Sequence, residues 1–164
     1  MRFKVVVTEQ LLATFLKKYS MKLTTAESCT GGLLAGTFLN VPGASSVYDE
    51  GYVTYANHAK SKLLGVKKKT LKKYGAVSKQ TAKQMAKGAA KAAGADVAIS
   101  VTGIAGPDGG TDEKPVGLVY IGCYVNGKTR VRKCLFSGER PQVRSQAVQA
   151  AMEFAIECIQ KSLM

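Results

Sequence analysis

The chain has little of several residue types that functional sites often require. It contains one histidine and no tryptophan, and its four cysteines are scattered without a Cys-x-x-Cys pair: Cys29, Cys123, Cys134 and Cys158. This pattern argues against a zinc site and against a disulfide framework, so we expect reduced thiols. We therefore predict that the protein uses neither a metal ion nor another cofactor.

Long apolar runs are also missing. No stretch approaches the roughly 18 uncharged apolar residues of a membrane-spanning helix, and the apolar run near the start, residues 5–7, is too short for a signal peptide. We expect a cytoplasmic protein with no membrane partner. Its 164 residues, 46% of them hydrophobic and 21% charged, predict a single globular domain over residues 1–164.

Acidic residues are scarce. Asp and Glu number 11 against 24 Lys and Arg, and residues 51–95 hold eleven lysines and no acidic residue. One interpretation is a surface that binds nucleic acid. The other is a solvated helix face, which we favour because the lysines are not interleaved with aromatic residues and have no arginines among them. A basic nucleotide- or nucleic-acid-binding protein without amidase activity is kept as the alternative function.

Helical and strand-like patterns alternate along the chain. The buried-strand pattern at residues 96–102 is typical of a parallel sheet, and Asn126-Gly127 predicts a hairpin turn. We predict an α/β fold, a three-layer α/β/α sandwich on a mixed, mostly parallel sheet. The expected helices cover residues 8–19, 33–40, 58–64, 67–74, 79–93 and 141–163, and the expected strands cover 22–25, 47–55, 96–102, 116–125 and 129–136.

A polar cluster follows the first predicted strand directly. Ser28, Cys29 and Thr30 precede Gly31 and Gly32, and a predicted helix follows. Such a junction directs backbone N–H groups and the positive end of a helix dipole at whatever binds there. Ser28 could act as a nucleophile, with the neighbouring amides as an oxyanion hole. The same residues also fit an ordinary helix cap and tight turn, and the pattern alone does not decide.

A second glycine-rich segment, residues 103–110, follows the buried strand at 96–102. Neither glycine-rich segment is a P-loop or a dinucleotide-binding fingerprint, so a kinase or a Rossmann dehydrogenase is not supported. In open α/β sheets ligands bind beyond the carboxyl ends of the strands. These two segments could therefore hold an anion, an oxyanion or both.

A serine nucleophile needs a base, and the residues alone offer several candidates. His58 is the single histidine, and Tyr55 and Lys60 lie close to it in the sequence. A lysine serves as a base only where burial or neighbouring cations lower its pKa. Because this segment is so rich in lysine, Lys60 also fits one more solvated charge.

Several long motifs, all in the same order, carry a resemblance to a known family. They are Thr25-Ala26-Glu27-Ser28-Cys29-Thr30-Gly31-Gly32, Tyr55-Ala56-Asn57-His58-Ala59-Lys60, Gly75-Ala76-Val77-Ser78, Gly103-Ile104-Ala105-Gly106-Pro107-Asp108-Gly109-Gly110 and Lys114-Pro115-Val116-Gly117. In these motifs the chain resembles the CinA C-terminal domain family of competence/damage-inducible proteins, known as nicotinamide mononucleotide deamidases. The resemblance covers nearly the whole chain. Many members carry a larger N-terminal domain, and this chain resembles the stand-alone form.

The resemblance implies hydrolysis of the carboxamide of nicotinamide mononucleotide to nicotinic acid mononucleotide and ammonia, within pyridine-nucleotide recycling and without a metal. It implies Ser28 as the nucleophile, Lys60 as its base and Tyr55 as a third catalytic residue. His58 has no role in this scheme. A different amidase acting on a related pyridine amide stays open, and we also expect a homo-oligomer.

The substrate-binding residues follow from the same resemblance. Arg144 matches an arginine that could meet the substrate phosphate. The other expected substrate-binding residues are Thr30, Gly31, Gly32, Asn57, Gly103, Ala105 and Gly106. Which of the two glycine-rich segments holds the oxyanion and which holds the phosphate stays open.

Overall fold

The computed structural model describes residues 6–164, which form a five-stranded sheet of order β2-β1-β3-β4-β5. The strands are β1 (Leu23–Glu27), β2 (Tyr52–Val53), β3 (Val97–Gly103), β4 (Leu118–Val125) and β5 (Lys128–Leu135). Strand β1 pairs in parallel with β2 and β3, and β4 is antiparallel to both β3 and β5. All strands except β4 therefore run in one direction, which confirms the mixed, mostly parallel sheet.

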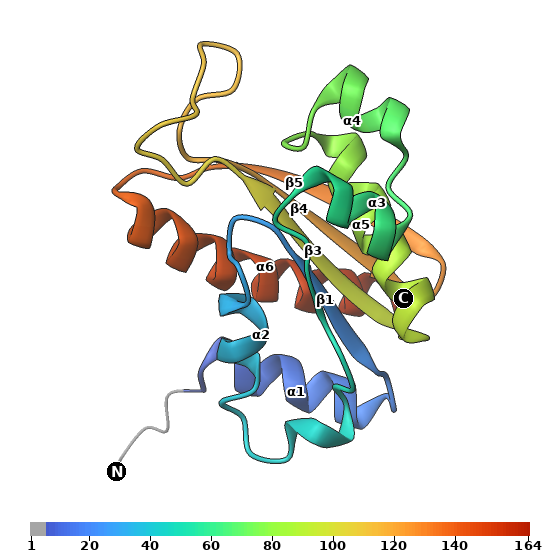
Figure 1. Cartoon of the computed structure of the whole chain (residues 1–164). Helices are drawn as coiled ribbons and strands as arrows, with labels where there is room; N and C mark the ends of the chain where they lie inside the picture. Colours follow the sequence, from blue (N-terminus) through green and yellow to red (C-terminus); the bar gives the residue numbers. More distant parts are fainter. Residues whose placement is uncertain (1–5) are drawn as a thin grey trace.

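Helices cover both faces of this sheet (Figure 1). One face carries α1 (Thr8–Lys18), α2 (Leu33–Phe38) and α6 (Arg140–Ser162), and the other carries α3 (Asn57–Leu64), α4 (Lys68–Tyr74) and α5 (Lys79–Ala93). The predicted three-layer α/β/α sandwich is confirmed. None of the helices in residues 6–164 is long and apolar enough to cross a membrane.

The hydrophobic core is split by the sheet into two clusters. In β3, Ile99 and Val101 belong to the larger cluster, on the side of α1, α2 and α6, whereas Ala98 belongs to the smaller one with Met85 of α5. This division follows from the strand geometry, because successive side chains point to opposite faces. Strands β1 and β3 are buried on both faces, as parallel strands between two helix layers are.

The predicted strand over residues 47–55 is wrong for most of its length. Only Tyr52 and Val53 form β2, and Ala44–Ser46 form a 3₁₀ turn before it. Side chains of β1 hold the intervening segment: Thr24 Oγ1 donates to the Glu50 carbonyl at 2.8 Å, and Thr25 Oγ1 lies 2.7 Å from the Tyr48 hydroxyl. The backbone adds a bond from the Leu23 amide to the Val47 carbonyl at 2.7 Å and an isolated parallel bridge between Leu23 and Tyr48, but no continuous ladder forms before Tyr52.

The carboxyl ends of β1 and β3 meet at one edge of the sheet, where Glu27 lies beside Val101. Ser28 follows β1 directly, and Gly103 is the last residue of β3. The segment between β3 and β4, yellow to orange in Figure 1, rises beyond this edge. Both glycine-rich segments of the sequence are thereby brought to the same place.

Candidate active site

A cavity of about 290 Å³ opens at this edge. Its walls come from the turn after β1, the start of α3, the segment before α5, the segment after β3 and the start of α6. The residues that line it are Ser28, Cys29, Tyr55, Lys60, Ala76, Val77, Thr102, Gly103, Ile104, Ala105, Gly106, Asp108, Gly109 and Arg140. Five separate segments of the chain therefore converge on a space near the lower end of the size range for small-molecule sites.

Ser28 and Lys60 are in direct contact within this cavity. Lys60 Nζ lies 2.9 Å from Ser28 Oγ, and it also donates to the carbonyls of Thr54 at 2.8 Å and Tyr55 at 3.1 Å. The Lys60 side chain is only 1% exposed. Helix α3 places it there, because Lys60 is on its buried side together with Leu64.

Burial lowers the pKa of Lys60 from its ordinary value of 10.5 to about 8. Desolvation is the cause, since water no longer stabilises the ammonium. Within residues 6–164, the two side-chain ion pairs are Lys22–Asp49 and Arg132–Glu157, so no carboxylate pairs with Lys60 to counter this effect. A substantial fraction of Lys60 is therefore neutral near pH 8.

The hydrogen bonds of Lys60 determine where its lone pair points once it is neutral. A neutral amine keeps two N–H donors and gains one acceptor site, whereas the carbonyls of Thr54 and Tyr55 can only accept. With the two N–H groups on those carbonyls, the lone pair faces Ser28 Oγ. The Ser28 hydroxyl then donates to Nζ, which is the arrangement that a serine nucleophile and a lysine base require.

The turn after Ser28 requires glycine. Gly31 has a φ of 55° and Gly32 a φ of 103°, a left-handed backbone that favours glycine. The Ser28 amide donates to the Val101 carbonyl at 2.9 Å, and the Gly31 amide donates to the Ser28 carbonyl at 3.1 Å. The Gly31 amide, which we expected to help bind an oxyanion, is therefore already occupied. The amides of Cys29, Thr30 and Gly32 donate no hydrogen bond to another residue among residues 6–164.

Two backbone amides in the first turn of α2 already donate to a side chain of the protein. Glu27, 1% exposed, accepts from the Leu34 amide at 2.8 Å and from the Ala35 amide at 3.1 Å. From the sequence, we expected the N–H groups at the start of this helix to point at a ligand. For these two amides that expectation is wrong. The Glu27 carboxylate is the anion at the helix start, where it fixes the turn that carries Ser28.

Two arginines, Arg140 and Arg144, lie one turn apart on α6, and their positions differ from the expectation that Arg144 meets the substrate. Arg144 donates to the carbonyls of Cys29 at 3.0 Å and Thr30 at 2.9 Å, so it braces the Ser28 turn and does not line the cavity. Arg140 lines the cavity and donates to the Gly106 carbonyl at 2.9 Å and the Tyr55 hydroxyl at 3.0 Å. Sequence reasoning missed Arg140, although a spacing of four residues places both arginines on one helix face.

The remaining predicted residues differ in their positions. Gly103, Ala105, Gly106 and Tyr55 line the cavity. The Tyr55 hydroxyl accepts a hydrogen bond from Arg140 and makes none with Ser28 or Lys60. The residues that do not line the cavity are Thr30, Gly31, Gly32, Asn57 and Arg144. Asn57 is the exposed first residue of α3, and His58, to which no role was given, is also exposed.

Thr102 and Asp108 are two of the cavity residues for which the sequence predicted no individual role. Thr102 Oγ1 donates to the Ala76 carbonyl at 2.8 Å and so joins β3 to the segment before α5. Asp108 contributes an exposed carboxyl group at the cavity wall. Among residues 6–164, no three His, Cys, Asp or Glu side chains form a group that could hold a metal ion.

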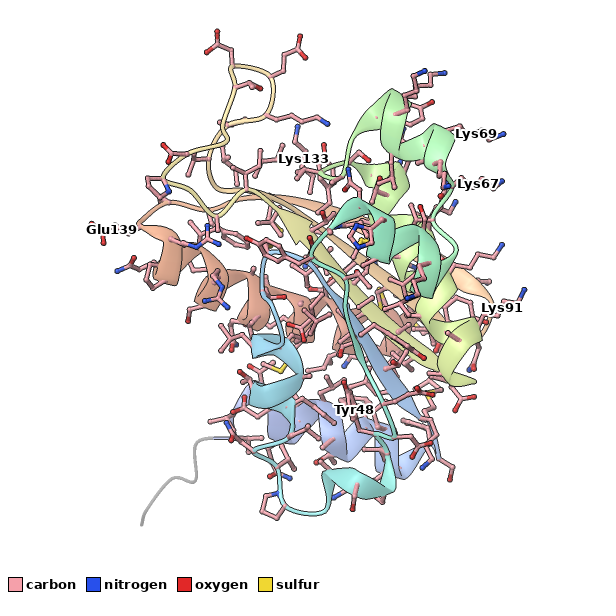
Figure 2. The ribbon with its side chains drawn as sticks, viewed as in Figure 1. Tyr48, Lys67, Lys69, Lys91, Lys133 and Glu139 are labelled. Atoms are coloured by element: carbon pink, nitrogen blue, oxygen red, sulfur yellow. The ribbon has the colours of Figure 1, made fainter. Side chains whose placement is uncertain are left out.

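The lysine-rich segment divides into one buried lysine and ten exposed ones. Of the eleven lysines in residues 51–95, only Lys60 is buried. The labelled Lys67, Lys69 and Lys91 point away from the molecule on the side of α3, α4 and α5 (Figure 2). These ten side chains are exposed, as the interpretation of a solvated surface requires, and Lys60 differs from them in being buried.

The chain was compared with known proteins. The family model of the CinA C-terminal domain matches residues 6–159. A CinA-like protein from Kosmotoga olearia is 55% identical over 146 residues, 89% of this chain and 35% of that protein. The chain thus spans about a third of the length of this curated relative.

Solved structures agree with the sequence comparison. A competence/damage inducible protein from Agrobacterium tumefaciens is 42% identical, with a TM-score of 0.88 over 96% of this chain and 98% of that one. A CinA superfamily protein from Klebsiella pneumoniae is 36% identical, with a TM-score of 0.90 over 95% of this chain and 99% of that one. The resemblance carried by the motifs is confirmed, and the chain belongs to the CinA C-terminal domain family.

Proposed function

We propose that this protein hydrolyses the carboxamide of nicotinamide mononucleotide to give nicotinic acid mononucleotide and ammonia. The observation that carries the proposal is the buried Lys60 amine at 2.9 Å from Ser28 Oγ, with its pKa lowered to about 8. Burying a lysine that has no carboxylate partner costs free energy. A role as base for the adjacent hydroxyl accounts for a lysine at this position. The choice of substrate rests on the family resemblance of the motifs and on the cation that Arg140 contributes to the cavity.

In the first half of the reaction, neutral Lys60 takes the proton of Ser28 while Oγ attacks the carboxamide carbon. A C–O bond forms and the carbonyl oxygen becomes an oxyanion. The amides of Cys29 and Thr30, directly after the nucleophile, are without acceptors in residues 6–164 and are the candidate donors to that oxyanion. Arg144 holds the Cys29 carbonyl, which shares a peptide group with the Thr30 amide, so it orients that amide.

Collapse of this intermediate breaks the C–N bond. The Lys60 ammonium gives its proton to the leaving nitrogen, and ammonia departs from a nicotinoyl ester on Ser28. Lys60 is then neutral again and activates a water molecule, which attacks the ester and releases the carboxylate product. A base with a pKa of about 8 suits both directions of proton transfer near neutral pH.

The phosphate is assigned to Arg140. A guanidinium has five N–H donors, and the contacts of Arg140 with Gly106 and Tyr55 use two of its nitrogens, one each. The remaining donors can meet phosphate oxygens, and charge-assisted bonds of this kind are the strong ones. The two contacts position the group before substrate arrives.

Replacing Arg140 with glutamine should raise KM for nicotinamide mononucleotide by roughly tenfold to a hundredfold, the loss of one or two charge-assisted bonds. Turnover of nicotinamide riboside, which lacks the phosphate, should change little. Steady-state ammonia release from both substrates measures this difference. An equal loss for the two substrates would show that Arg140 supports the cavity through Gly106 and Tyr55 and does not bind phosphate.

Three exposed lysines at the start of α4, with Lys67 just before the helix, are expected to have no part in the reaction. Changing Lys67, Lys68 and Lys69 together to glutamine should alter deamidation less than about twofold, because these side chains lie on the solvated face. The comparison is of kcat/KM at low and moderate salt. A large, salt-dependent loss in a folded variant would show that this face steers the anionic substrate.

The proposed activity is tested by ammonia release from nicotinamide mononucleotide, free nicotinamide and the intact dinucleotide. We expect release from the mononucleotide, and none in the Ser28→Ala variant. Release from another of the three compounds with equal efficiency would replace the proposed substrate. If none of them releases ammonia, filter binding of a short duplex at two salt concentrations tests the alternative, because binding through phosphate contacts weakens steeply with salt.

A further inference from the structure

A second, smaller cavity lies at the end of the sheet opposite the Ser28–Lys60 cavity. Its volume is about 110 Å³, and it opens between the end of β4, the start of β5 and the end of α6. Val125 of β4 pairs with Val97 at the start of β3, whereas the first cavity lies beyond the end of β3. The seven residues of β3 separate the two places, a distance of roughly 20 Å. The cysteines and basic residues that line it are Cys123, Lys128, Arg130, Cys158 and Lys161.

Two free thiols meet in this cavity. Cys123 on β4 is fully buried and Cys158 on α6 is 3% exposed, and both line the space. Both residues face the same small space, and the neighbouring Cys123 thiol together with the charges of Arg130 and Lys161 lowers the pKa of Cys158. The proximity of Cys158 and complete burial raise the pKa of Cys123. Of the two thiols, Cys158 is therefore the one more easily deprotonated.

The charges around the pair favour an anion. Arg130 is the residue directly opposite Cys123 in the β4–β5 ladder, Lys161 follows Cys158 by three residues on α6, and Lys128 lines the same cavity. The acidic group nearest in sequence is Glu157, and its carboxylate is paired with Arg132. A thiolate is stabilised in such surroundings, whereas a metal cation is repelled.

The other two cysteines, Cys29 and Cys134, differ from Cys158 in the direction of their pKa shift. Burial raises the pKa of Cys29 to about 11, and burial also raises the pKa of Cys134. Cys29 lies beside Ser28 in the polar cluster that follows the first strand. In the folded protein Cys29 is protonated at neutral pH, whereas the pKa of Cys158 is lowered.

We propose that Cys158 and Cys123 form an oxidisable dithiol that reduces a small hydroperoxide. The Cys158 sulfur attacks one peroxide oxygen, so that an S–O bond forms and the O–O bond breaks, and the departing oxygen takes a proton and leaves as water or an alcohol. The Cys123 sulfur then attacks the sulfenic sulfur of Cys158. An S–S bond forms, the S–O bond breaks and the hydroxyl leaves as water, so two thiols have lost two electrons in total to one peroxide.

The cavity limits which oxidants can react. About 110 Å³ admits a molecule the size of hydrogen peroxide, while a Cys158 that is 3% exposed is out of reach for a bulky disulfide reagent. We therefore expect hydrogen peroxide to oxidise the native protein at this pair, and a large aromatic disulfide to leave both thiols reduced until the protein is unfolded.

The test is peptide mapping by mass spectrometry of the full reduced chain after exposure to hydrogen peroxide. We expect a Cys123–Cys158 disulfide, seen as a linked peptide pair that has lost two hydrogens, with Cys158 consumed at least about tenfold faster than Cys29 or Cys134. In Cys123→Ser the sulfenic acid should persist on Cys158 and be trapped by dimedone. Cys29→Ser and Cys134→Ser are the matched controls and should still form the linked pair.

Oxidation of Cys29 or Cys134 before Cys158 would overturn the proposal, as would sulfenic acid on Cys158 with Cys123 left as a free thiol in the unmodified chain. The unmodified chain alone gives this answer, so the test does not depend on the folding of a variant. Because the readout is the mass of peptides, it is also independent of whether the protein releases ammonia from any substrate.

Discussion

Lys60→Arg should be as inactive as Lys60→Ala, with kcat lowered by roughly 10²–10⁴-fold, the usual contribution of a general base. Arginine keeps the positive charge but cannot give up its proton, so it has no lone pair for the Ser28 hydroxyl. Alanine removes the amine altogether. If the amine acts as a base, the two substitutions have the same consequence, although only one of them removes the charge.

The matched control is Lys62→Arg, on the same helix two residues further on, because Lys62 is exposed and contributes nothing to the cavity. It should retain full activity. Thermal unfolding of each variant shows whether the protein is still folded, which matters because Lys60 is 1% exposed and fills space in the core. Substantial activity in Lys60→Arg would show that the position supplies only positive charge, and the base would have to be sought at Tyr55, His58 or a water molecule.

Ser28→Ala is expected to lower ammonia release by about 10³-fold or more with the fold intact, since it removes the attacking oxygen. The change deletes one hydroxyl, and Lys60 keeps its two carbonyl partners, Thr54 and Tyr55. Circular dichroism and the unfolding temperature should therefore stay close to those of the unmodified protein.

Cys29→Ala is the control next to Ser28 in the sequence. The Cys29 thiol lines the same cavity, but its pKa is raised to about 11 and it is not a nucleophile at neutral pH. Its loss should change kcat/KM less than about threefold, the scale of a surface or packing adjustment. Near-normal turnover in Ser28→Ala together with a large loss in Cys29→Ala would move the nucleophile from the hydroxyl to the thiol.

Local signals in the sequence predict those elements whose ends are set by local chemistry. Helix α5 begins after Ser78, whose hydroxyl accepts from the Thr81 amide, and ends at Gly94 in a left-handed conformation. The hairpin between β4 and β5 turns at Asn126 and Gly127, both with positive φ. In these cases the residues that define the boundary are the residues that form it.

The predictions that failed depend on contacts between distant segments. The segment before β2 is extended in sequence pattern but is held by the side chains of Thr24 and Thr25, which no local signal reveals. Arg140 and Arg144 both belong to the start of α6, and only the position of the Ser28 turn decides which one braces it and which one faces the cavity.

Lys60 is the clearest example of this limit. Eleven lysines in residues 51–95 carry the same charge and lie in similar sequence surroundings. Lys60 becomes buried when α3 packs against α5 and its Leu64 joins Ala26 of β1 in the smaller core cluster. Composition therefore indicates a basic surface, and the family motif singles out Lys60 within it. The distance to Ser28 and the depth of burial come only from the tertiary structure.

The most direct test of the central claim, that neutral Lys60 takes the proton of Ser28, is the dependence of kcat/KM on pH. The active form is the neutral amine, so the rate should rise as pH passes upward through the pKa of Lys60 in the folded protein, about 8, and then level off. Measurement above roughly pH 6.5 avoids most of the titration of the substrate phosphate. A tenfold rise per pH unit below an apparent pKa near 8 is the predicted result. A flat profile, or a rise centred near the unperturbed lysine value of about 10.4, would contradict it.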